Sequence, residues 1–351
     1  MVGADGRLPL PWLDAALREG LQRRGHALLV TGSAGVGQME LALVLAQAWL
    51  CEGPPDGPRP CGRCAGCRLV QARSHPDLLV LLPEALSVAL GWDTFGDADE
   101  EGASERKGKP SKEIKVEAVR TAVEFAQTTA SRGHGKVVLV HPAERMNPIA
   151  ANTLLKTLEE PPGAARFVLG CAAPDALLPT IRSRCEALRL APPPRETALA
   201  WLAEQGVRDA AVLLEACGGQ PLEALQWSRD GIDAKLWQQF PTLVARGDAL
   251  PFASWPVPRL VDAMQKLCHD SLCVSAGAWP RYFPAGAIKA GPRAEALNRW
   301  ARDLARIAET AEHPWNAGLA VEALVEAAKN ALRTTPTGER AARGKSVNSA
   351  A

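Results

Sequence analysis

Three short apolar runs mark the first half of the chain. They occupy residues 27–31, 137–140 and 167–171. Stretches with helical spacing or helix-forming composition follow or separate them, at 38–50, 116–126 and 147–160. Apolar runs of this length predict buried strands, and their alternation with helices predicts a parallel sheet flanked by helices. The sequence therefore predicts an α/β domain of the phosphate-loop type.

The helix predicted at 147–160 has clear signals at both ends. Asn147 is a favoured N-cap and Pro148 suits the first helical position, whereas the two prolines after Glu160 cannot continue a helix. Glu159 and Glu160 therefore lie at the helix C-terminus, where the helix dipole disfavours negative charge. Solvated surface charge explains either residue alone, but their placement suggests an interface.

After residue 190 the strand signals stop. The proline-rich run 191–194 predicts a linker. Helical patterns follow it at 197–205, 210–217, 222–227, 259–274, 293–311 and 317–332. We therefore expect a small helical lid domain and then an all-helical third domain.

The predicted domain boundaries follow from these signals. They give an α/β domain at 1–190, a lid domain at 191–235, a helical domain at 236–335 and a disordered tail at 336–351. The segment 91–112 mixes acidic and basic residues with few apolar ones, so it is expected to be a mobile loop.

Composition limits the possible functions. The 351 residues are 47% hydrophobic, and 40 Lys+Arg against 39 Asp+Glu give a net charge of +1. A protein that holds DNA alone is usually strongly basic, so any nucleic-acid contact is expected to be local or shared with partners. No apolar run reaches the ~18 residues of a membrane span, and no signal-peptide pattern precedes Trp12. The expected location is the cytoplasm.

A glycine-rich loop follows the first apolar run. Gly32, Gly35 and Gly37 match a phosphate-binding loop, in which backbone N–H groups wrap the phosphates. Gln38 and Met39 stand where that pattern has a lysine and a hydroxyl. A neutral amide does not offset phosphate charge, and a thioether is a poor ligand for Mg²⁺. We expect this loop to bind ATP weakly or not at all, and not productively.

A second part of an ATP site is also altered. A working ATPase carries acidic residues after a later strand, where they hold magnesium. Here the run 137–140 is followed by His141 and, three residues on, by Glu144. Glu144 alone is a candidate remnant, but the aspartate expected directly after the strand is missing. His141 is interpreted as a packed or solvent-facing residue rather than a catalytic base.

Four of the nine cysteines form a cluster in the sequence. They are Cys51, Cys61, Cys64 and Cys67, with glycines that let the backbone fold back on itself. Four thiolates can converge on one tetrahedral ion, and a set with no spare ligand favours structural zinc. Disulfides and an iron–sulfur cluster are the alternatives. Without an export signal, the reduced and metal-bound state is favoured.

The triplet Ser183, Arg184 and Cys185 completes a set of motifs in a consistent order. Together with the glycine loop, the cysteine insertion and the run Leu-Leu-Lys-Thr-Leu-Glu-Glu-Pro-Pro at 154–162, it resembles bacterial clamp-loader subunits of the AAA+ family. The resemblance covers about residues 8–230. It implies that Arg184 is an arginine finger that reaches the ATP site of a neighbouring motor subunit. Arg182 is a weaker candidate without motif support.

Within that family the degenerate loop resembles that of members that are not motors. The segment 219–225 resembles a second nucleotide sensor, and the arginine that its active form carries near Leu222 is absent. The resemblance therefore implies a non-hydrolysing subunit of the DNA polymerase III holoenzyme. Its implied partners are a delta subunit and gamma/tau motor subunits in a ring, with the third domain in the collar. The beta sliding clamp and primed DNA would be reached through that ring.

Two other functions stay open from the sequence. An active ATPase motor would have to tolerate Gln38 and Met39, and saturable hydrolysis by the chain alone would reveal it. A zinc-dependent DNA-binding module is disfavoured by the near-neutral charge and by the lack of an aromatic and basic face beside the cysteines.

Overall fold

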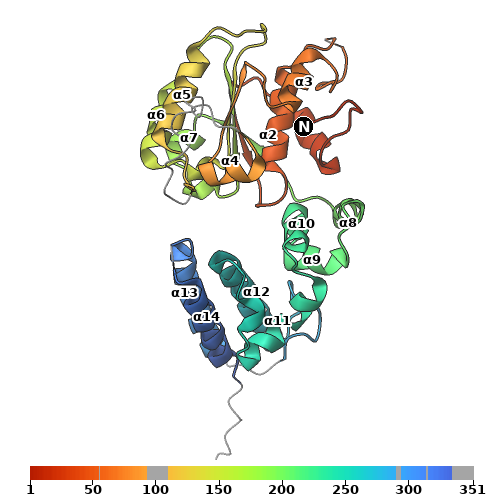
Figure 1. Ribbon diagram of the computed structural model, residues 1–351, viewed down its shortest axis with the longest axis vertical. Coiled ribbons are helices and arrows are strands. Elements are labelled where there is room, and N and C mark those ends of the chain that lie inside the picture. Colours follow the sequence, from red (N-terminus) through yellow and green to blue (C-terminus); the bar gives the residue numbers. More distant parts are fainter. Residues whose placement is uncertain (55, 93–109, 290–293, 314, 334–351) are drawn as a thin grey trace, which may run out of the picture. The chain divides into compact units, whose positions relative to one another are not determined.

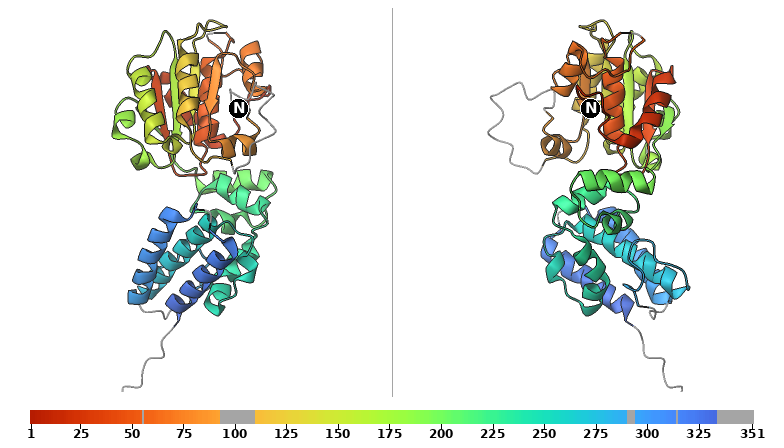
Figure 2. Two further views of the ribbon diagram at one scale, coloured as in Figure 1. Left: turned by 60° about the vertical axis from the view of Figure 1, so that its left-hand side comes forward. Right: turned by 90° about the vertical axis from the view of Figure 1, so that its right-hand side faces the viewer.

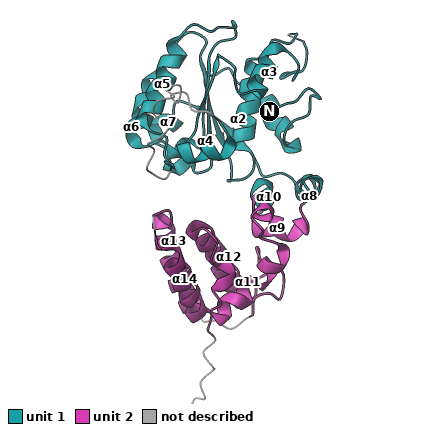
Figure 3. Cartoon of the chain, in the orientation of Figure 1, with its two compact units in different colours: residues 1–206, 219–225 teal, residues 207–218, 226–351 magenta. Residues whose placement is uncertain are grey.

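The structure is a computed structural model. It describes residues 1–54, 56–92, 110–289, 294–313 and 315–333. The chain divides into two compact units (Figure 3): residues 1–206 with 219–225, and residues 207–218 with 226–351. The predicted three-domain division stays a prediction. Most of the loop expected at 91–112 and all of the tail expected at 336–351 lie outside the described residues.

The first unit is built around a five-stranded parallel sheet (Figure 1). The strand order is β2-β3-β4-β1-β5, and every neighbouring pair runs parallel. The strands are β1 (Ala27–Thr31), β2 (Leu78–Leu81), β3 (Val137–Val140), β4 (Arg166–Cys171) and β5 (Glu186–Arg189). The predicted fold class, a parallel sheet flanked by helices and followed by a helical region, is confirmed.

Sequence analysis predicted only three of these five strands. It missed β2, a run of four buried apolar residues that is too short to separate from a buried helix by periodicity. It also missed β5 at the sheet edge, where Leu188 is the only buried residue of four. An edge strand that covers one face with one apolar side chain gives a weak pattern.

Helices cover both faces of the sheet (Figures 1 and 2). On one face lie α5 (Val116–Gln127) and α6 (Pro148–Glu159), whose inner residues join the strands in one apolar core. On the other face lie α1 (Asp14–Gln22) and α2 (Gln38–Trp49), and α2 is almost wholly buried. The shorter helices of this unit are α3 (Ala65–Gln71), α4 (Glu84–Leu90), α7 (Pro179–Arg182) and α8 (Arg195–Glu204).

The second unit is helical and has an aromatic core. Its helices are α9 (Ala210–Ala216), α11 (Ala234–Arg246), α12 (Val257–Ser275), α13 (Ala294–Thr310) and α14 (Ala317–Leu332), and α10 (Pro221–Arg229) belongs partly to each unit. Trp237 stacks on Phe283 with ring centroids 4.3 Å apart. Sequence analysis missed α11 because Pro241 lies inside it, where a proline usually ends a helix. No helix among the described residues is long and apolar enough to cross a membrane.

Candidate functional site

The glycine-rich loop lies at the carboxyl edge of the parallel sheet. It joins the end of β1 to the start of α2, and ligands of open parallel sheets bind at this edge. Gly35 and Gly37 have φ values of 72° and 109°, which residues with a Cβ rarely adopt. The backbone shape of a phosphate loop is therefore retained.

Gln38 uses its side chain to brace this loop. Its amide nitrogen donates to the carbonyl oxygens of Gly32 at 2.6 Å and Ser33 at 2.8 Å. The side chain is buried, and so is that of Met39. The amide therefore makes hydrogen bonds within the loop, at the position from which a lysine would reach phosphate.

A cavity of about 390 Å³ lies beside the loop. Its walls include Gly35, Gln38 and Met39 of the loop region and several apolar side chains: Leu43, Leu86, Leu90 and Trp92. Glu40 also lines it, and burial raises the pKa of this carboxyl. Arg73 also lines the cavity, but its Nη1 donates to the carbonyl oxygens of Leu90 and Gly91. The cavity keeps space for a ligand, and the loop itself offers no lysine to a phosphate.

The end of β3 shows a second altered position. Oε1 of Glu144 accepts hydrogen bonds from the N–H groups of Ala172 at 2.9 Å and Ala173 at 3.2 Å, so one carboxylate oxygen holds the chain after β4. His141 fills space beside Gly170, where an added Cβ would lie 2.6 Å from its Nδ1. Burial lowers the pKa of His141, which favours the neutral ring. Glu144 and His141 therefore both contact the end of β4 and the chain that follows it.

The start of α10 contacts the same loop through its backbone. The N–H of Leu222 donates to the carbonyl of Gly35 at 3.1 Å. An added Cβ on Gly35 would lie 3.2 Å from Cβ of Glu223. Leu222 thus meets the loop with a peptide group, and its side chain brings no positive charge to the cavity.

The structure brings the four predicted cysteines together. Sγ of Cys51 lies 3.9 Å from that of Cys64, and Sγ of Cys61 lies 3.9 Å from that of Cys67. All four sulfur atoms lie within 4.8 Å of one another. Around a tetrahedral ion with ~2.3 Å metal–sulfur bonds, neighbouring sulfurs would be roughly 3.8 Å apart. The cluster therefore fits a single metal ion.

Local hydrogen bonds support thiolates at this cluster. Backbone N–H groups of Glu52 and Cys67 each donate to Sγ of Cys64 at 3.3 Å. The N–H of Arg63 lowers the pKa of Cys61 to about 6, whereas burial raises the pKa of Cys51. All nine cysteines are free, so the disulfide alternative is not supported. Sulfurs this close leave no room for the iron and sulfide atoms of a cluster.

Arg184 lies at the opposite edge of the sheet from the loop. It follows α7 and precedes β5, and Leu28 near the start of β1 pairs with Glu186 at the start of β5. Because the strands are parallel, Arg184 stands at their amino ends while the loop stands at their carboxyl ends. Strands of four or five residues separate the two edges by roughly 15 Å. Arg184 is therefore remote from the chain's own loop.

The guanidinium of Arg184 has two partners at this edge. Its Nε donates to Oε1 of Glu159 at 2.7 Å, and Nη2 donates to the same oxygen. Its Nη1 donates to the carbonyl of Thr180 at 2.9 Å. The side chain keeps 30% of its surface exposed. Ser183 caps α7, and burial raises the pKa of Cys185 to about 12, so that its thiol stays neutral.

Arg182 points to a different partner. Its Nη1 donates to Oδ1 of Asp175 at 2.8 Å, in an exposed pair. Sequence analysis singled out Glu159 for its position but not as the partner of Arg184. The two residues are 25 positions apart and meet only because α6 and α7 pack together. No spacing rule gives that contact before the topology is known.

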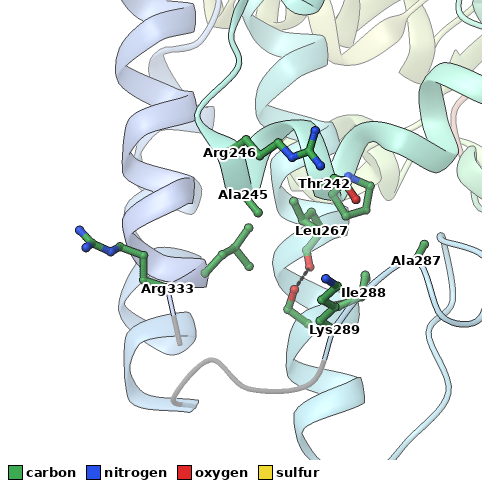
Figure 4. A pocket seen from close by; sticks show the side chains of 11 residues that line it. Thr242, Ala245, Arg246, Leu267, Ala287, Ile288, Lys289 and Arg333 are labelled. Carbon is green, nitrogen blue, oxygen red and sulfur yellow. Dashed lines mark hydrogen bonds between the residues drawn. The ribbon is translucent and has the colours of Figure 1, made fainter. Parts of the chain in front are cut away.

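A second cavity, of about 490 Å³, lies within the helical unit (Figure 4). Its wall includes Leu267 and Ile288, with Arg246, Lys289 and Arg333 among the lining residues. The guanidinium of Arg333 points away from the other labelled side chains (Figure 4). These cations do not converge on one point, so the cavity does not form an anion site.

Comparison with known proteins gives a consistent set of similarities. A family model described as "DNA polymerase III, delta subunit" matches residues 14–194, just over half of the chain. The chain is 36% identical over 256 residues to "DNA polymerase III subunit delta'" of Yersinia pestis, which covers 68% of each protein. It is 36% identical over 237 residues to the Escherichia coli K12 protein of the same name, which covers 66% of this chain and 62% of that one.

A motor-type relative is also similar. The chain is 33% identical over 172 residues to "DNA polymerase III subunit tau" of Salmonella typhimurium, which covers 48% of this chain and 22% of tau. The matched part spans less than two thirds of the Escherichia coli delta' protein, and its share of tau is smaller still.

Proposed function

Because the chain belongs to the delta-prime family of DNA polymerase III subunits, we propose that it serves in the clamp loader without hydrolysing ATP itself. In this proposal it lends Arg184 to the ATP site of a neighbouring gamma/tau motor subunit. It carries a structural zinc ion at its four clustered cysteines. Its partners are the motors and a delta subunit, and through the ring the beta sliding clamp and primed DNA.

One observation carries the finger proposal: Arg184 is partly exposed at the edge of the sheet opposite to the chain's own loop. A group in that position cannot act on a nucleotide bound at its own loop. It can act on one bound by another subunit that packs against this edge. The lack of an ammonium and a hydroxyl at Gln38 and Met39 points the same way, because a chain without its own ATP chemistry contributes to hydrolysis only in trans.

The proposed role of Arg184 is electrostatic. During phosphoryl transfer, negative charge develops on the oxygens around the γ-phosphorus, and a guanidinium placed there stabilises it. Arginine suits this task because its planar fork can contact two phosphate oxygens at once and stays charged at all physiological pH values. In related phosphoryl-transfer systems, a finger supplied in trans accelerates the reaction by roughly 10³- to 10⁵-fold.

The experiment that tests this role uses a reconstituted clamp loader with Arg184→Ala in this subunit alone. We expect hydrolysis at the dependent ATP site to fall by roughly 10³-fold or more, measured as DNA-stimulated ATPase. Arg182→Ala is the matched control, because Arg182 is two residues away and pairs with the exposed Asp175. An ATPase rate equal to that of the wild-type loader, with normal assembly, would remove the finger role.

The zinc proposal rests on the donor set and its spacing. Four sulfur ligands leave no open position for a substrate, so the ion would hold structure rather than catalyse. Cys51 follows α2, and the cysteines Cys64 and Cys67 lie at the start of α3. When bound, the ion would offset part of the negative charge of the thiolates and join these two helices across the intervening loop.

Cys64→Ser tests the zinc proposal. We expect the purified variant to lose its zinc, from about one ion per chain to none, because a three-sulfur set with one hydroxyl binds the ion weakly. Inductively coupled plasma mass spectrometry measures the content, and proteolysis near residue 60 measures the loosening. Cys268→Ser in the helical unit is the control, because Cys268 belongs to neither group of described residues that could hold a metal ion. Full zinc retention in Cys64→Ser would contradict the assignment.

A further inference from the structure

We infer that Glu159 is a positioning residue for the arginine finger: it holds one side of the Arg184 guanidinium and leaves the other side for phosphate. This inference rests on the proposed role of Arg184. Its basis is the pair of hydrogen bonds from Nε and Nη2 of Arg184 to a single oxygen, Oε1 of Glu159. Two bonds from adjacent nitrogens to one oxygen fix the distance and direction of the guanidinium, and the bond from Nη1 to the carbonyl of Thr180 restrains its rotation about that direction.

The remaining donors of Arg184 define the free side. A guanidinium has five N–H groups, of which two donate to Glu159 and one to the carbonyl of Thr180. One N–H remains on each Nη nitrogen. The contact from Nη1 to Oγ of Ser183 is 3.5 Å long, at the outer limit of a hydrogen bond. The two terminal N–H groups can therefore meet two phosphate oxygens without breaking the contact with Glu159.

Glu159 is itself held in place. It is the last residue of α6, whose first turn is capped by the Asn147 side chain, which accepts from the N–H of Ala150 at 2.8 Å. On the inner face of α6, Leu154 and Leu158 are buried in the apolar core. A helix end fixed in this way gives the carboxylate a defined position. The positive guanidinium also relieves the unfavourable charge at the helix C-terminus.

Thr180 holds one N–H of Nη1 of the same guanidinium from α7, and one N–H on each terminal nitrogen is left over. This short helix packs against α6, and its Ile181 is fully buried. Arg184 is thus clamped between the end of α6 and α7 before any partner arrives. A flexible arginine would lose rotamer freedom on meeting the neighbour's ATP, and the clamp reduces that loss.

The sequence contains a matched control next to Glu159. Glu160 is also acidic and exposed, but Nε and Nη2 of Arg184 donate to Glu159. We therefore compare Glu159→Gln with Glu160→Gln, in loaders reconstituted with each variant. For Glu159→Gln we expect kcat at the ATP site that Arg184 serves to fall about tenfold, with KM for ATP and ring assembly unchanged, because misplacing a group that acts in the transition state lowers kcat. Glu160→Gln should match the wild type.

A double-mutant cycle separates positioning from a merely structural role. If Glu159 acts through Arg184, Glu159→Gln adds no further loss to Arg184→Ala. Glu159→Asp, which keeps the charge but shortens the reach, should lie between the wild type and Glu159→Gln. It also serves as the second variant if Glu159→Gln does not assemble.

The possible outcomes are distinguishable. A wild-type rate in Arg184→Ala refutes the finger role and the inference with it. A reduced rate in Arg184→Ala, with Glu159→Gln equal to Glu160→Gln, leaves the finger role standing and refutes the inference. An additive loss in the double variant also refutes it. A faster Glu159→Gln loader would mean that Glu159 restrains the finger, which again contradicts positioning.

Discussion

The two edges of the sheet differ in how their polar groups are used. At the carboxyl edge, the Gln38 amide bonds to the loop carbonyls and Glu144 bonds to peptide N–H groups after β4. At the amino edge, Arg184 is held by Glu159 and Thr180 and keeps terminal N–H groups available on a partly exposed surface. The named side chains of the first edge bond mainly to the chain's own peptide groups, although Oε2 of Glu144 and Nδ1 of His141 are buried without a partner. The second edge retains donors for another molecule.

Burial explains this difference. A buried polar group without a partner costs roughly 1–3 kcal/mol, so a nucleotide loop that no longer meets phosphate is stabilised by internal partners. An arginine at the surface has no such requirement, because water satisfies it. In a family member that loses its own ATP chemistry, the side chains at the buried edge are therefore expected to be replaced. The side chains at the edge that meets another subunit can stay the same.

Restoring the lysine and the hydroxyl of the glycine-rich loop is the strongest test of this difference between the two edges of the sheet. We expect the double variant Gln38→Lys with Met39→Thr to remain without ATP turnover as an isolated chain. The lysine and hydroxyl are restored, but no aspartate follows β3, Leu222 supplies no cation, and no finger reaches the loop in trans. The missing finger alone lowers the rate by roughly 10³- to 10⁵-fold. A sensitive phosphate-release assay measures the rate.

A binding measurement completes that experiment. Isothermal titration with ATP and Mg²⁺ should show tighter binding in the double variant than in the wild type, because a positive charge and a magnesium ligand are added. The single variant Met39→Thr is the control without the charge. Saturable hydrolysis by the wild-type chain would reverse the interpretation of the carboxyl edge.

The main features of the sheet were predictable from the sequence, and the reasons are local. The strand at 27–31 and both ends of α6 are determined by residues that are neighbours in the sequence. Rules that use only neighbouring residues are therefore sufficient to predict them. Strand β5 was missed because only Leu188 faces the core, and α11 was missed because Pro241 lies inside it. In both cases tertiary packing outweighs a weak local pattern. The sequence of a single segment does not reveal that packing.

A smaller effect should follow from removing the brace of the loop. Gln38→Ala takes away two hydrogen bonds and leaves the carbonyls of Gly32 and Ser33 without that partner. We expect the free energy of unfolding to fall by about 1–3 kcal/mol, measured by urea denaturation. The exposed Gln127→Ala is the control for loss of a glutamine side chain. Equal stability of the two variants would mean that the brace contributes nothing measurable.

Some functional residues could be predicted from local sequence, and others depend on contacts between distant segments. The cysteine cluster was predictable because its ligands lie within 17 positions, and the structure brings them together. The bond between Arg184 and Glu159 was not predictable, because it joins the end of α6 to a residue 25 positions later that follows α7. The brace formed by Gln38 was also missed, since a residue type that departs from a motif indicates what is lost and not what the replacement contacts.

The smallest expected effect concerns the pH dependence of the carboxyl edge. Burial lowers the pKa of His141 below its usual value of about 6.5, so the unfolded chain takes up this proton at higher pH than the folded chain does. As the pH falls below about 6.5, protonation of the unfolded state therefore lowers the stability of the wild type.

His141→Gln cannot take up the proton and should lose less stability between pH 7 and pH 5.5, as measured by urea denaturation at each pH. His313→Gln, at an exposed position in the helical unit, should lose as much as the wild type. If His141→Gln and the wild type lose equally, the His141 ring is open to water, and the carboxyl edge is less closed than its contacts indicate.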